Sequence, residues 1–526
     1  MNFGLERKEK ILLAVIMIIS AILLIAGWRI FWFISDDAFI SFRYISNSML
    51  GYGYVWNPPP FRPVEGYTNF LWMVLLELIW RVFGVEPPVS VNYISLAFTF
   101  LALVLAALFC LRMKWSGQLR SYRVYLVGLM MAWLIANRTI LAWSSSGLET
   151  AFFNFLFILW IYLVLFGKIE DGWRGAQIIL AAVAIYLTRP DGILILVASF
   201  AILLEVRLRK GPALSEKLML SASPAVIVLL HLIWRRTKYG EWLPNTYYAK
   251  YTGIWPESGI RYLFSFILEY ALWIWIAAGV WLVIKRIRER KLAGETPSPK
   301  WRYRSYKLHI VIAALVVHTL YYTLVIGGDH FEYRVYSHLL YLIVISFIWM
   351  LNSLEIRKTA ALVLMTVFLL FSLPVPWSHW AHTRDLDTRE QTHKLRANLH
   401  QRWPEPLDRY VKLFDDMQHW LIDHYVCVRH QEHKINYEFI ESIFPSRKRG
   451  LSIAPEGYPV FPFPAVGLAS WVLPHVNIID LHGLNDYVIA RNPRSVSSFR
   501  MMAHDRTAPE GYIRGFLPNV RLRSGG

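Results

Sequence analysis

Long apolar segments alternate with short polar loops over the first 375 residues of the chain. The first segment, residues 11–33, is long enough for a helix to cross the hydrocarbon core, which takes roughly 20 residues. Later apolar segments lie at residues 91–111, 123–138, 149–167, 175–188, 192–206, 217–234, 263–284, 308–326, 335–353 and 359–375. The pattern predicts a polytopic α-helical membrane protein with about 11 transmembrane helices.

One further apolar segment, residues 67–83, does not fit this alternation. It contains Glu77 and Arg81 and is followed by Pro87 and Pro88. If it crossed the membrane, every later basic loop would move to the outer side. We therefore interpret it as an amphipathic helix at the outer interface.

Composition and charge agree with a membrane location. Hydrophobic residues make up 56% of the 526 residues, and the formal net charge is +18. The basic residues cluster in loops beside apolar segments, which the positive-inside bias explains without nucleic acid as a partner. This bias predicts a cytoplasmic N-terminus, a transmembrane domain over residues 1–375 and an external C-terminal domain over residues 376–526.

Two adjacent carboxylates, Asp36 and Asp37, directly follow the first apolar segment. Neighbouring carboxylates repel each other when both are charged, so one has a raised pKa or the pair holds a cation. Either arrangement suits a general base. The structural alternative is that one of them only caps the following helix. Arg43 lies seven residues after Asp36 on the same helix face, where it would orient the carboxylate or bind phosphate.

The remaining polar motifs fall on the same outer side. They carry Glu65, Glu149, Arg189, Asp191, Asn245, Tyr247, Lys250, Asp329, His330, Glu332 and Arg334. Ionisable residues that gather at membrane ends facing one compartment indicate a functional site. Ordinary loop polarity, the alternative, does not predict this one-sided distribution.

Several of these residues have simpler interpretations. Glu149 fits a capping box, and Asp191 follows a proline in a first helical turn and fits a cap. The segment 242–250 mixes aromatic residues with a lysine, as an interfacial belt does, although tyrosine and lysine also suit a lipid phosphate and a sugar. Arg189 is different, because a cation at a helix N-terminus opposes the macrodipole unless an anion such as phosphate lies between them. The alternative is a long side chain that only extends its charge to the membrane interface.

The loop 327–334 combines two glycines with acidic, histidine and arginine side chains. A divalent cation held by Asp329, His330 and Glu332 is one interpretation, but the spacing is not specific for a metal. We favour contact with substrate, in which Arg334 is a second phosphate ligand.

Residues 376–526 lack long apolar runs. The stretch 476–481 is typical of a strand, and flanking glycines and prolines predict turns, so we expect a small α/β domain. The polar loop that follows, up to Asp486, is a common place for ligand contacts. The chain contains no GxGxxG, Walker, HExxH or CxxC motif, so nucleotide-dependent chemistry is unsupported.

The combination of motifs resembles a known family. An acid after the first span, an interfacial helix, basic outer loops and an external C-terminal domain look like a GT-C glycosyltransferase that uses a polyprenyl-phosphate sugar. More narrowly, the chain resembles the terminal β-(1→2) arabinofuranosyltransferases of bacterial cell walls and their LphB-type relatives. The matching segments are DDAFISFRY, GYGYVWNPPPFRPVEGYTNFLW, SSSGLET, TRPDG, YGEWLPNTYYAK, GGDHFEYR and DLHGLND.

This resemblance implies a GT-C fold in the bacterial inner membrane and an inverting transfer to a cell-envelope glycan acceptor. The donor would be a lipid such as decaprenyl-phosphoryl arabinose, although relatives in other bacteria would use other sugars. It makes Asp36 or Asp37 the base and assigns the donor phosphate to Arg43, Arg189, Lys250 and Arg334. Sugar and acceptor contacts would come from Tyr44, Glu65, Glu149, Asp191, Asn245, Tyr247, Asp329, His330, Glu332 and Asp486.

Two other classes compete with the enzyme. A transporter or flippase of a lipid-linked anion also needs cations near its spans, but such proteins place key groups near the bilayer midplane, often within inverted repeats. A sensor of external ligands would not require Asp36 and Asp37. Release of free polyprenyl phosphate from a donor lipid would distinguish the enzyme from both.

Overall fold

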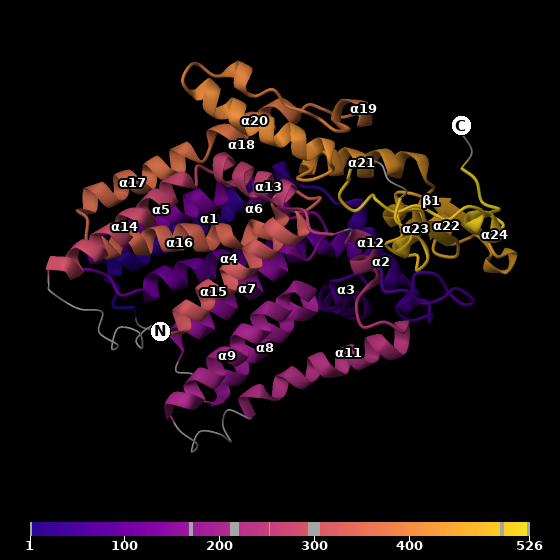
Figure 1. The fold of residues 1–526 in the computed structure, drawn as a ribbon, viewed down its shortest axis with the longest axis horizontal. Helices are drawn as coiled ribbons and strands as arrows, with labels where there is room; N and C mark the ends of the chain where they lie inside the picture. Colours follow the sequence, from indigo (N-terminus) through magenta and orange to yellow (C-terminus); the bar gives the residue numbers. More distant parts are fainter. Residues whose placement is uncertain are drawn as a thin grey trace.

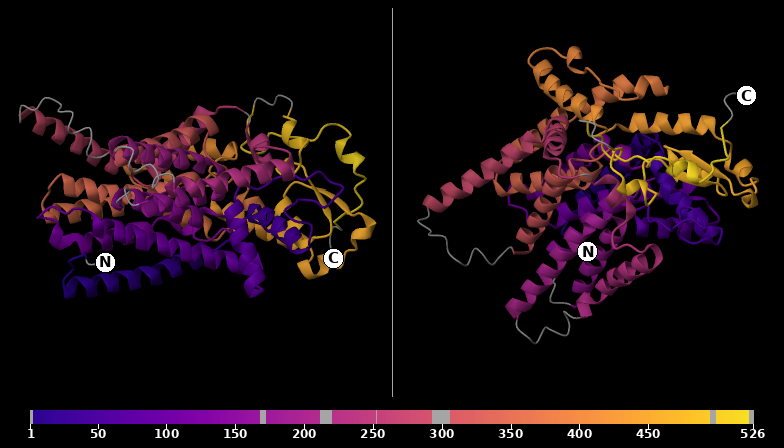
Figure 2. Two further views of the ribbon diagram at one scale, coloured as in Figure 1. Left: turned by 90° about the horizontal axis from the view of Figure 1, so that it is seen from below. Right: turned by 45° about the vertical axis from the view of Figure 1, so that its right-hand side comes forward.

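The computed structural model describes residues 3–167, 172–210, 220–251, 253–292, 306–494 and 499–522. Parts of three predicted basic loops, residues 168–171, 211–219 and 293–305, lie outside the described residues. The molecule is mostly helical, and its long helices run side by side along the longest axis (Figure 1). The last part of the chain, drawn in yellow, lies at one end of this bundle in further views (Figure 2).

Among the described residues, five helices are long and apolar enough to cross a membrane, or up to six if a bent pair forms one span. The five are α1 (Arg7–Ile30), α4 (Pro87–Arg112), Tyr306–Ile326, Arg334–Ser353 and Lys358–Thr383. Helices α15 (Tyr306–Leu320), α16 (Ser337–Ser353), α17 (Lys358–Phe371) and α18 (Pro374–Thr383) form most of the last three. These helices support a polytopic helical membrane protein, but the predicted eleven spans are not shown.

The predicted span 263–284 is broken in the structure. Helices α13 (Pro256–Glu269) and α14 (Trp273–Leu292) meet at an angle of 90°. Ala271 between them has a φ of 48°, a left-handed conformation that ends the first helix. Other predicted spans correspond to shorter helices: α5 (Arg123–Ile135), α7 (Thr150–Phe166), α8 (Gly172–Thr188), α9 (Ile193–Lys210) and α11 (Val226–Tyr239).

Short helices cover the end of the bundle where the polar motifs lie. Helix α3 (Phe70–Phe83) corresponds to the predicted interfacial segment 67–83. Its 14 residues extend about 21 Å, which is too short to cross the hydrocarbon core. It lies beside α2 (Asp36–Met49) at this end, near α12 (Asn245–Lys250) (Figure 1). Helix α6 (Arg138–Trp143) packs on α1 and α5.

The C-terminal segment combines helices with a small sheet. Strands β1 (Val460–Phe463) and β2 (Asn477–Asp480) pair in parallel, and α23 (Val466–Val472) connects them. The stretch predicted as a strand is therefore β2. The remaining helices of this segment are α19 (Arg389–Thr392), α20 (Leu407–Asp423), α21 (His430–Ile443), α22 (Arg447–Gly450) and α24 (Tyr512–Gly515). One hydrophobic cluster contains residues on both sides of position 375, so the two parts share a core.

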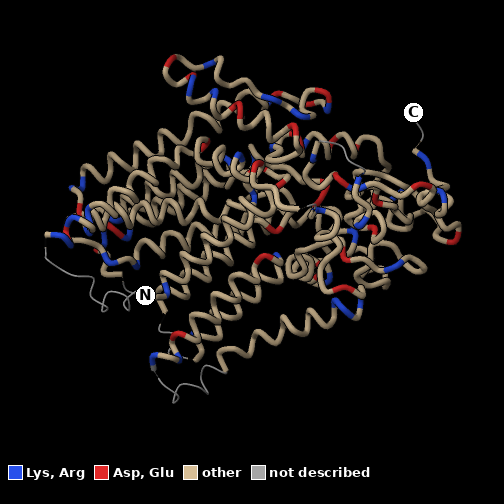
Figure 3. The backbone as a smooth tube through the Cα atoms, viewed as in Figure 1, with Lys and Arg blue, Asp and Glu red and all other residues tan. Residues whose placement is uncertain are grey.

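Lysine and arginine occupy the left-hand ends of the long helices. Figure 3 shows them there and also in the C-terminal segment, at the other end and along the upper edge of the molecule. Arg112 ends α4, Arg123 begins α5, and Lys358 begins α17 at the left-hand end. An accumulation of basic residues at one set of helix ends is what the positive-inside rule expects of a cytoplasmic face.

Candidate functional site

A polar cavity of about 450 Å³ lies where the short helices meet the ends of the long ones. Its walls come from the start of α2, the loop before α3, the residues preceding α7, the turn between α8 and α9, α12, and the segments 321–334 and 500–503. It brings together nine of the residues predicted from sequence: Asp37, Glu149, Arg189, Asp191, Tyr247, Lys250, Asp329, His330 and Arg334.

Arg189 joins two carboxylates and a tyrosine. Its guanidinium lies 3.3 Å from Glu149 Oε1 and 3.2 Å from Asp191 Oδ1, and it donates to the Tyr322 hydroxyl at 2.7 Å. Asp191 also accepts from Tyr322 and contacts His318 Nε2, each at 3.0 Å. Burial alone would raise the pKa of Asp191, but the charge of Arg189 and these contacts hold it well below its usual range.

The caps predicted for Glu149 and Asp191 are not formed. Glu149 is the residue before α7, yet its side chain makes no capping hydrogen bond and instead accepts from Arg189 and Asn69. Asp191 is held by Arg189 and by residues of the Tyr306–Ile326 span. Both carboxylates therefore belong to the polar cavity.

Arg334 and Asp329 form a second paired unit. Two guanidinium nitrogens donate to the two carboxylate oxygens at 2.7 and 3.0 Å, a bidentate geometry that fixes both groups. The pKa of Asp329 is lowered: burial opposes its charge, but Arg334 outweighs that effect. Gly327 and Gly328, with φ of 90° and 100°, allow the turn that brings this pair to the cavity.

Lys250 and Asp37 are the exception in this paired site. Both line the cavity, and within the described part of the chain neither has a hydrogen-bond or ion-pair partner for its charged group. Burial lowers the pKa of Lys250, while Asp37 and Asp329 act in the opposite direction and Arg334 and Arg189 reinforce the lowering. The cavity thus presents an unpaired ammonium group and an unpaired carboxylate.

His330 has a defined tautomer at the cavity wall. Its Nδ1 lies 2.8 Å from the carbonyl oxygen of Tyr425. A carbonyl only accepts, so Nδ1 carries the proton and Nε2 keeps its lone pair. Burial and the nearby His504 lower the pKa of His330 to about 4, which keeps the ring neutral.

Some cavity residues have no counterpart in the sequence prediction. Tyr322 lies in a π-helical turn, Tyr321–Ile326, that ends a predicted span, and only its interfacial position hints at a role. Arg500 reaches the wall from the C-terminal segment and donates to the carbonyls of Gly253 and Ile254. No motif around Arg500 distinguishes it in the sequence.

Asp36 faces away from the cavity. Its carboxylate accepts the backbone N–H groups of Gly467 and Leu468 at 3.1 and 2.7 Å, so it caps the N-terminus of α23. Burial raises its pKa to about 7 against these hydrogen bonds. The structure gives Asp36 a capping role on a distant helix and leaves Asp37 at the cavity.

Arg43 shares the helix face of Asp36, as predicted, but holds protein rather than phosphate. It is fully buried and donates to five backbone carbonyls. They belong to Trp56, Ser470, Leu473, Pro474 and Val476, at 2.7 to 3.2 Å. Asp36 and Arg43 therefore hold opposite ends of α23 and fasten the C-terminal segment to α2.

Four more residues predicted to contact sugar or acceptor do not line the polar cavity, and their side chains bind other parts of the protein. The Tyr44 hydroxyl accepts the Gly66 N–H at 2.8 Å, and Asn245 Nδ2 donates to the carbonyls of residues 483, 484 and 486. Glu65 pairs with Arg235. Asp486 accepts the N–H groups of Val488 and Ile489.

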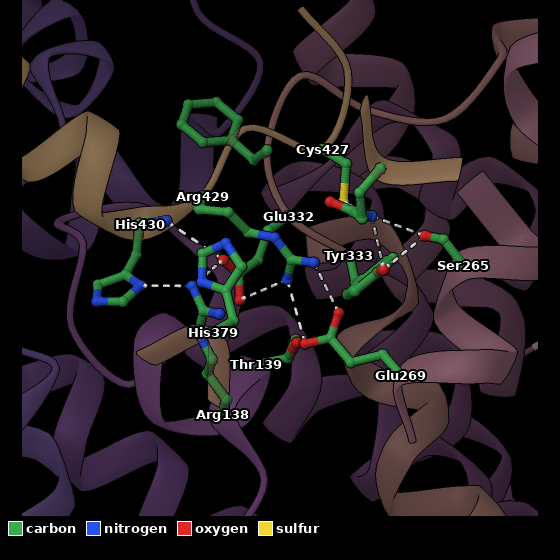
Figure 4. Close-up of polar contacts among 12 residues, drawn as sticks. Arg138, Thr139, Ser265, Glu269, Glu332, Tyr333, His379, Cys427, Arg429 and His430 are labelled. Carbon is green, nitrogen blue, oxygen red and sulfur yellow. Dashed lines mark hydrogen bonds and ion pairs between the residues drawn. The ribbon is translucent and has the colours of Figure 1, made fainter. Parts of the chain in front are cut away.

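Glu332 is also outside the cavity, within a buried ionic cluster (Figure 4). It lies 3.1 Å from Arg138 and 3.7 Å from Arg429, which in turn contacts Glu269 at 2.8 Å. Glu332 therefore cannot join Asp329 and His330 around a cation. In the described ranges, no group of three or more His, Cys, Asp or Glu residues has an arrangement that would hold a metal ion.

No family model, curated protein or solved structure matches this chain.

Proposed function

We propose that this protein is a membrane glycosyltransferase of the GT-C type, which moves a sugar from a polyprenyl-phosphate donor to a cell-envelope glycan acceptor. One observation carries the proposal: Lys250 and Asp37, without a partner in the described part of the chain, line the same cavity at the ends of candidate membrane helices. Transfer from a lipid phosphate needs an anion site and a proton acceptor close together.

The negative charge of the leaving lipid phosphate would be stabilised by the cations of the polar cavity. A polyprenyl-phosphate sugar is a phosphodiester with one negative charge, and the lipid phosphate left after transfer carries roughly 1.5 to 2. Lys250 has no competing carboxylate within ion-pair distance among the described residues, so it is the first ligand we assign to this phosphate. Arg189 and Arg334 add to the field, and their paired carboxylates hold them in place.

Asp37 is the residue we assign as general base. It would accept the proton of the acceptor hydroxyl as that oxygen attacks the anomeric carbon. The bond between the anomeric carbon and the phosphate oxygen breaks on the opposite face, so polyprenyl phosphate leaves and the configuration is inverted. The carboxylate needs no rearrangement for this role, because it makes no hydrogen bond within the described ranges. The adjacent Asp36 is occupied by α23.

The cavity also has an apolar side suited to a lipid. Ile193, Leu243, Tyr247 and Tyr251 line it and are 37 to 44% exposed. In the proposed location, at the outer face of a bacterial inner membrane, these side chains would meet the isoprenoid chain of the donor. A cavity with a charged end and an apolar side fits an amphiphilic ligand better than a free anion.

The direct test uses purified protein in detergent with a radiolabelled polyprenyl-phosphate sugar and a glycan acceptor. We expect release of free polyprenyl phosphate and label on the acceptor. Lys250→Met should abolish most donor binding, whereas Lys358→Met, at the opposite end of the bundle, serves as the matched control. Donor binding without release of polyprenyl phosphate would favour a flippase, and no binding would favour a sensor.

A further inference from the structure

A second, larger cavity lies beside the first in the C-terminal segment. It has a volume of about 860 Å³, within the range of small-ligand sites, and lies between the loop 56–64 and residues 457–458, 478–479, 485–488 and 512–519. We call it the aromatic cavity. We propose that it binds a neutral glycan, and this inference rests on the proposed function in identifying that glycan with the acceptor.

The walls of the aromatic cavity are rich in rings. Phe61 stacks between Tyr458 and Phe516, with centroids 5.9 and 5.6 Å apart and interplanar angles of 3° and 21°. Tyr458 is 42% exposed, so part of its ring remains open to solvent. Sugar rings carry an apolar C–H face that packs on such aromatic surfaces while their hydroxyls form hydrogen bonds at the edge.

The polar groups of this cavity suit hydroxyls rather than phosphate. Its charged lining residues, within the described ranges, are Arg62 and Asp486. The Arg62 guanidinium lies 3.4 Å over the Tyr487 ring and 3.7 Å from Glu241, so its charge is already engaged. Tyr512 donates to Asp486, and this pair presents oxygen atoms of a kind that sugar hydroxyls bind. The polar cavity differs because it holds an unpaired lysine.

A thin wall separates the two cavities. Val64 and Asn485 line the aromatic cavity, whereas their near neighbours Gly66 and Leu484 line the polar one. Gly66 packs so closely that a Cβ there would lie 1.8 Å from Asn485 Oδ1. The Tyr44 hydroxyl contacts both Gly66 and Asn485. The two cavities are therefore neighbours, and a glycan that extends around this wall from Asp37 would place its further residues in the aromatic cavity.

In the test, the full-length protein in detergent is titrated with short linear oligosaccharides of arabinose, mannose and glucose. Saturation-transfer NMR and calorimetry measure the binding. We expect at least one to bind, and Tyr458→Ala and Phe61→Ala each to weaken it about tenfold. Tyr458→Phe, which keeps the ring, should bind almost normally. Phe439→Ala removes a 46% exposed ring of α21 outside the cavity and should change nothing.

The outcomes distinguish failure of the glycan site from failure of the proposed transfer. The inference is overturned if no oligosaccharide binds, or if Tyr458→Ala binds as well as the unmodified protein. Because Tyr458 is partly exposed, that variant stays informative even if Phe61→Ala does not fold. Glycan binding without release of polyprenyl phosphate would keep this site and reject the proposed transfer. Donor turnover without oligosaccharide binding would reject this site alone.

Discussion

Replacement of the two adjacent aspartates by asparagine should separate catalysis from stability. Asp37→Asn removes a carboxylate that has no partner within the described ranges, so we expect unchanged folding and donor binding. Loss of a general base typically costs 10² to 10⁴ in rate, and we expect transfer to fall by at least about a hundredfold. Asp36→Asn leaves one accepting oxygen where two carboxylate oxygens cap α23, so it should act mainly on stability.

The expected effect of Asp36 on stability depends on pH. Its pKa is raised to about 7 by burial, whereas an unfolded aspartate has a value near 3.9. Between these values the folded protein binds more protons than the unfolded chain, so the stability that this group contributes is complete below about pH 4 and is lost as pH rises towards 7. A difference of three in pKa corresponds to about 4 kcal/mol of folding free energy. Asp36→Asn should flatten this dependence.

Two assays distinguish these expectations. Release of polyprenyl phosphate measures turnover, and thermal unfolding in detergent at several pH values measures stability. The reasoning is refuted if Asp37→Asn keeps turnover within a few-fold of the unmodified protein. It is also refuted if Asp36→Asn loses turnover as severely as Asp37→Asn while its unfolding temperature and pH dependence stay the same.

Three further predictions concern other parts of the molecule. Arg43→Ala removes a buried donor shared by five carbonyls, of which those of Trp56 and Leu473 keep a second donor, and should lower stability by about 3 to 5 kcal/mol, seen as a lower unfolding temperature. Loss of a phosphate ligand would instead lower only donor affinity. Glu332→Gln leaves the buried Arg138 without its carboxylate partner, whereas Arg429 keeps Glu269, and we expect destabilisation by a similar amount. An unchanged unfolding temperature together with lost turnover would instead assign Glu332 to the functional site. Reporter fusions after Lys210 should be cytoplasmic and those after Gly253 external, and the opposite pattern would reverse the proposed orientation.

The general class of the protein follows from the sequence because a helix that crosses lipid must be apolar over its whole length. Apolar segments of about 20 residues give the candidate spans, and basic loops sort their ends. The same sorting gathers Asp37, Arg189, Lys250 and Arg334 on one side, and the structure places all four around one cavity. Local composition also marks β2.

The roles of individual side chains depend on segments far away in the chain. Adjacent residues of a helix point about 100° apart, so only the position of α23 decides that Asp36 caps it while Asp37 faces the cavity. Arg43 is saturated by carbonyls more than 400 residues later in sequence. No local pattern contains these contacts. The sequence thus determined which residues gather at one end of the helical bundle, and tertiary packing alone decided which of them have no partner among the described residues.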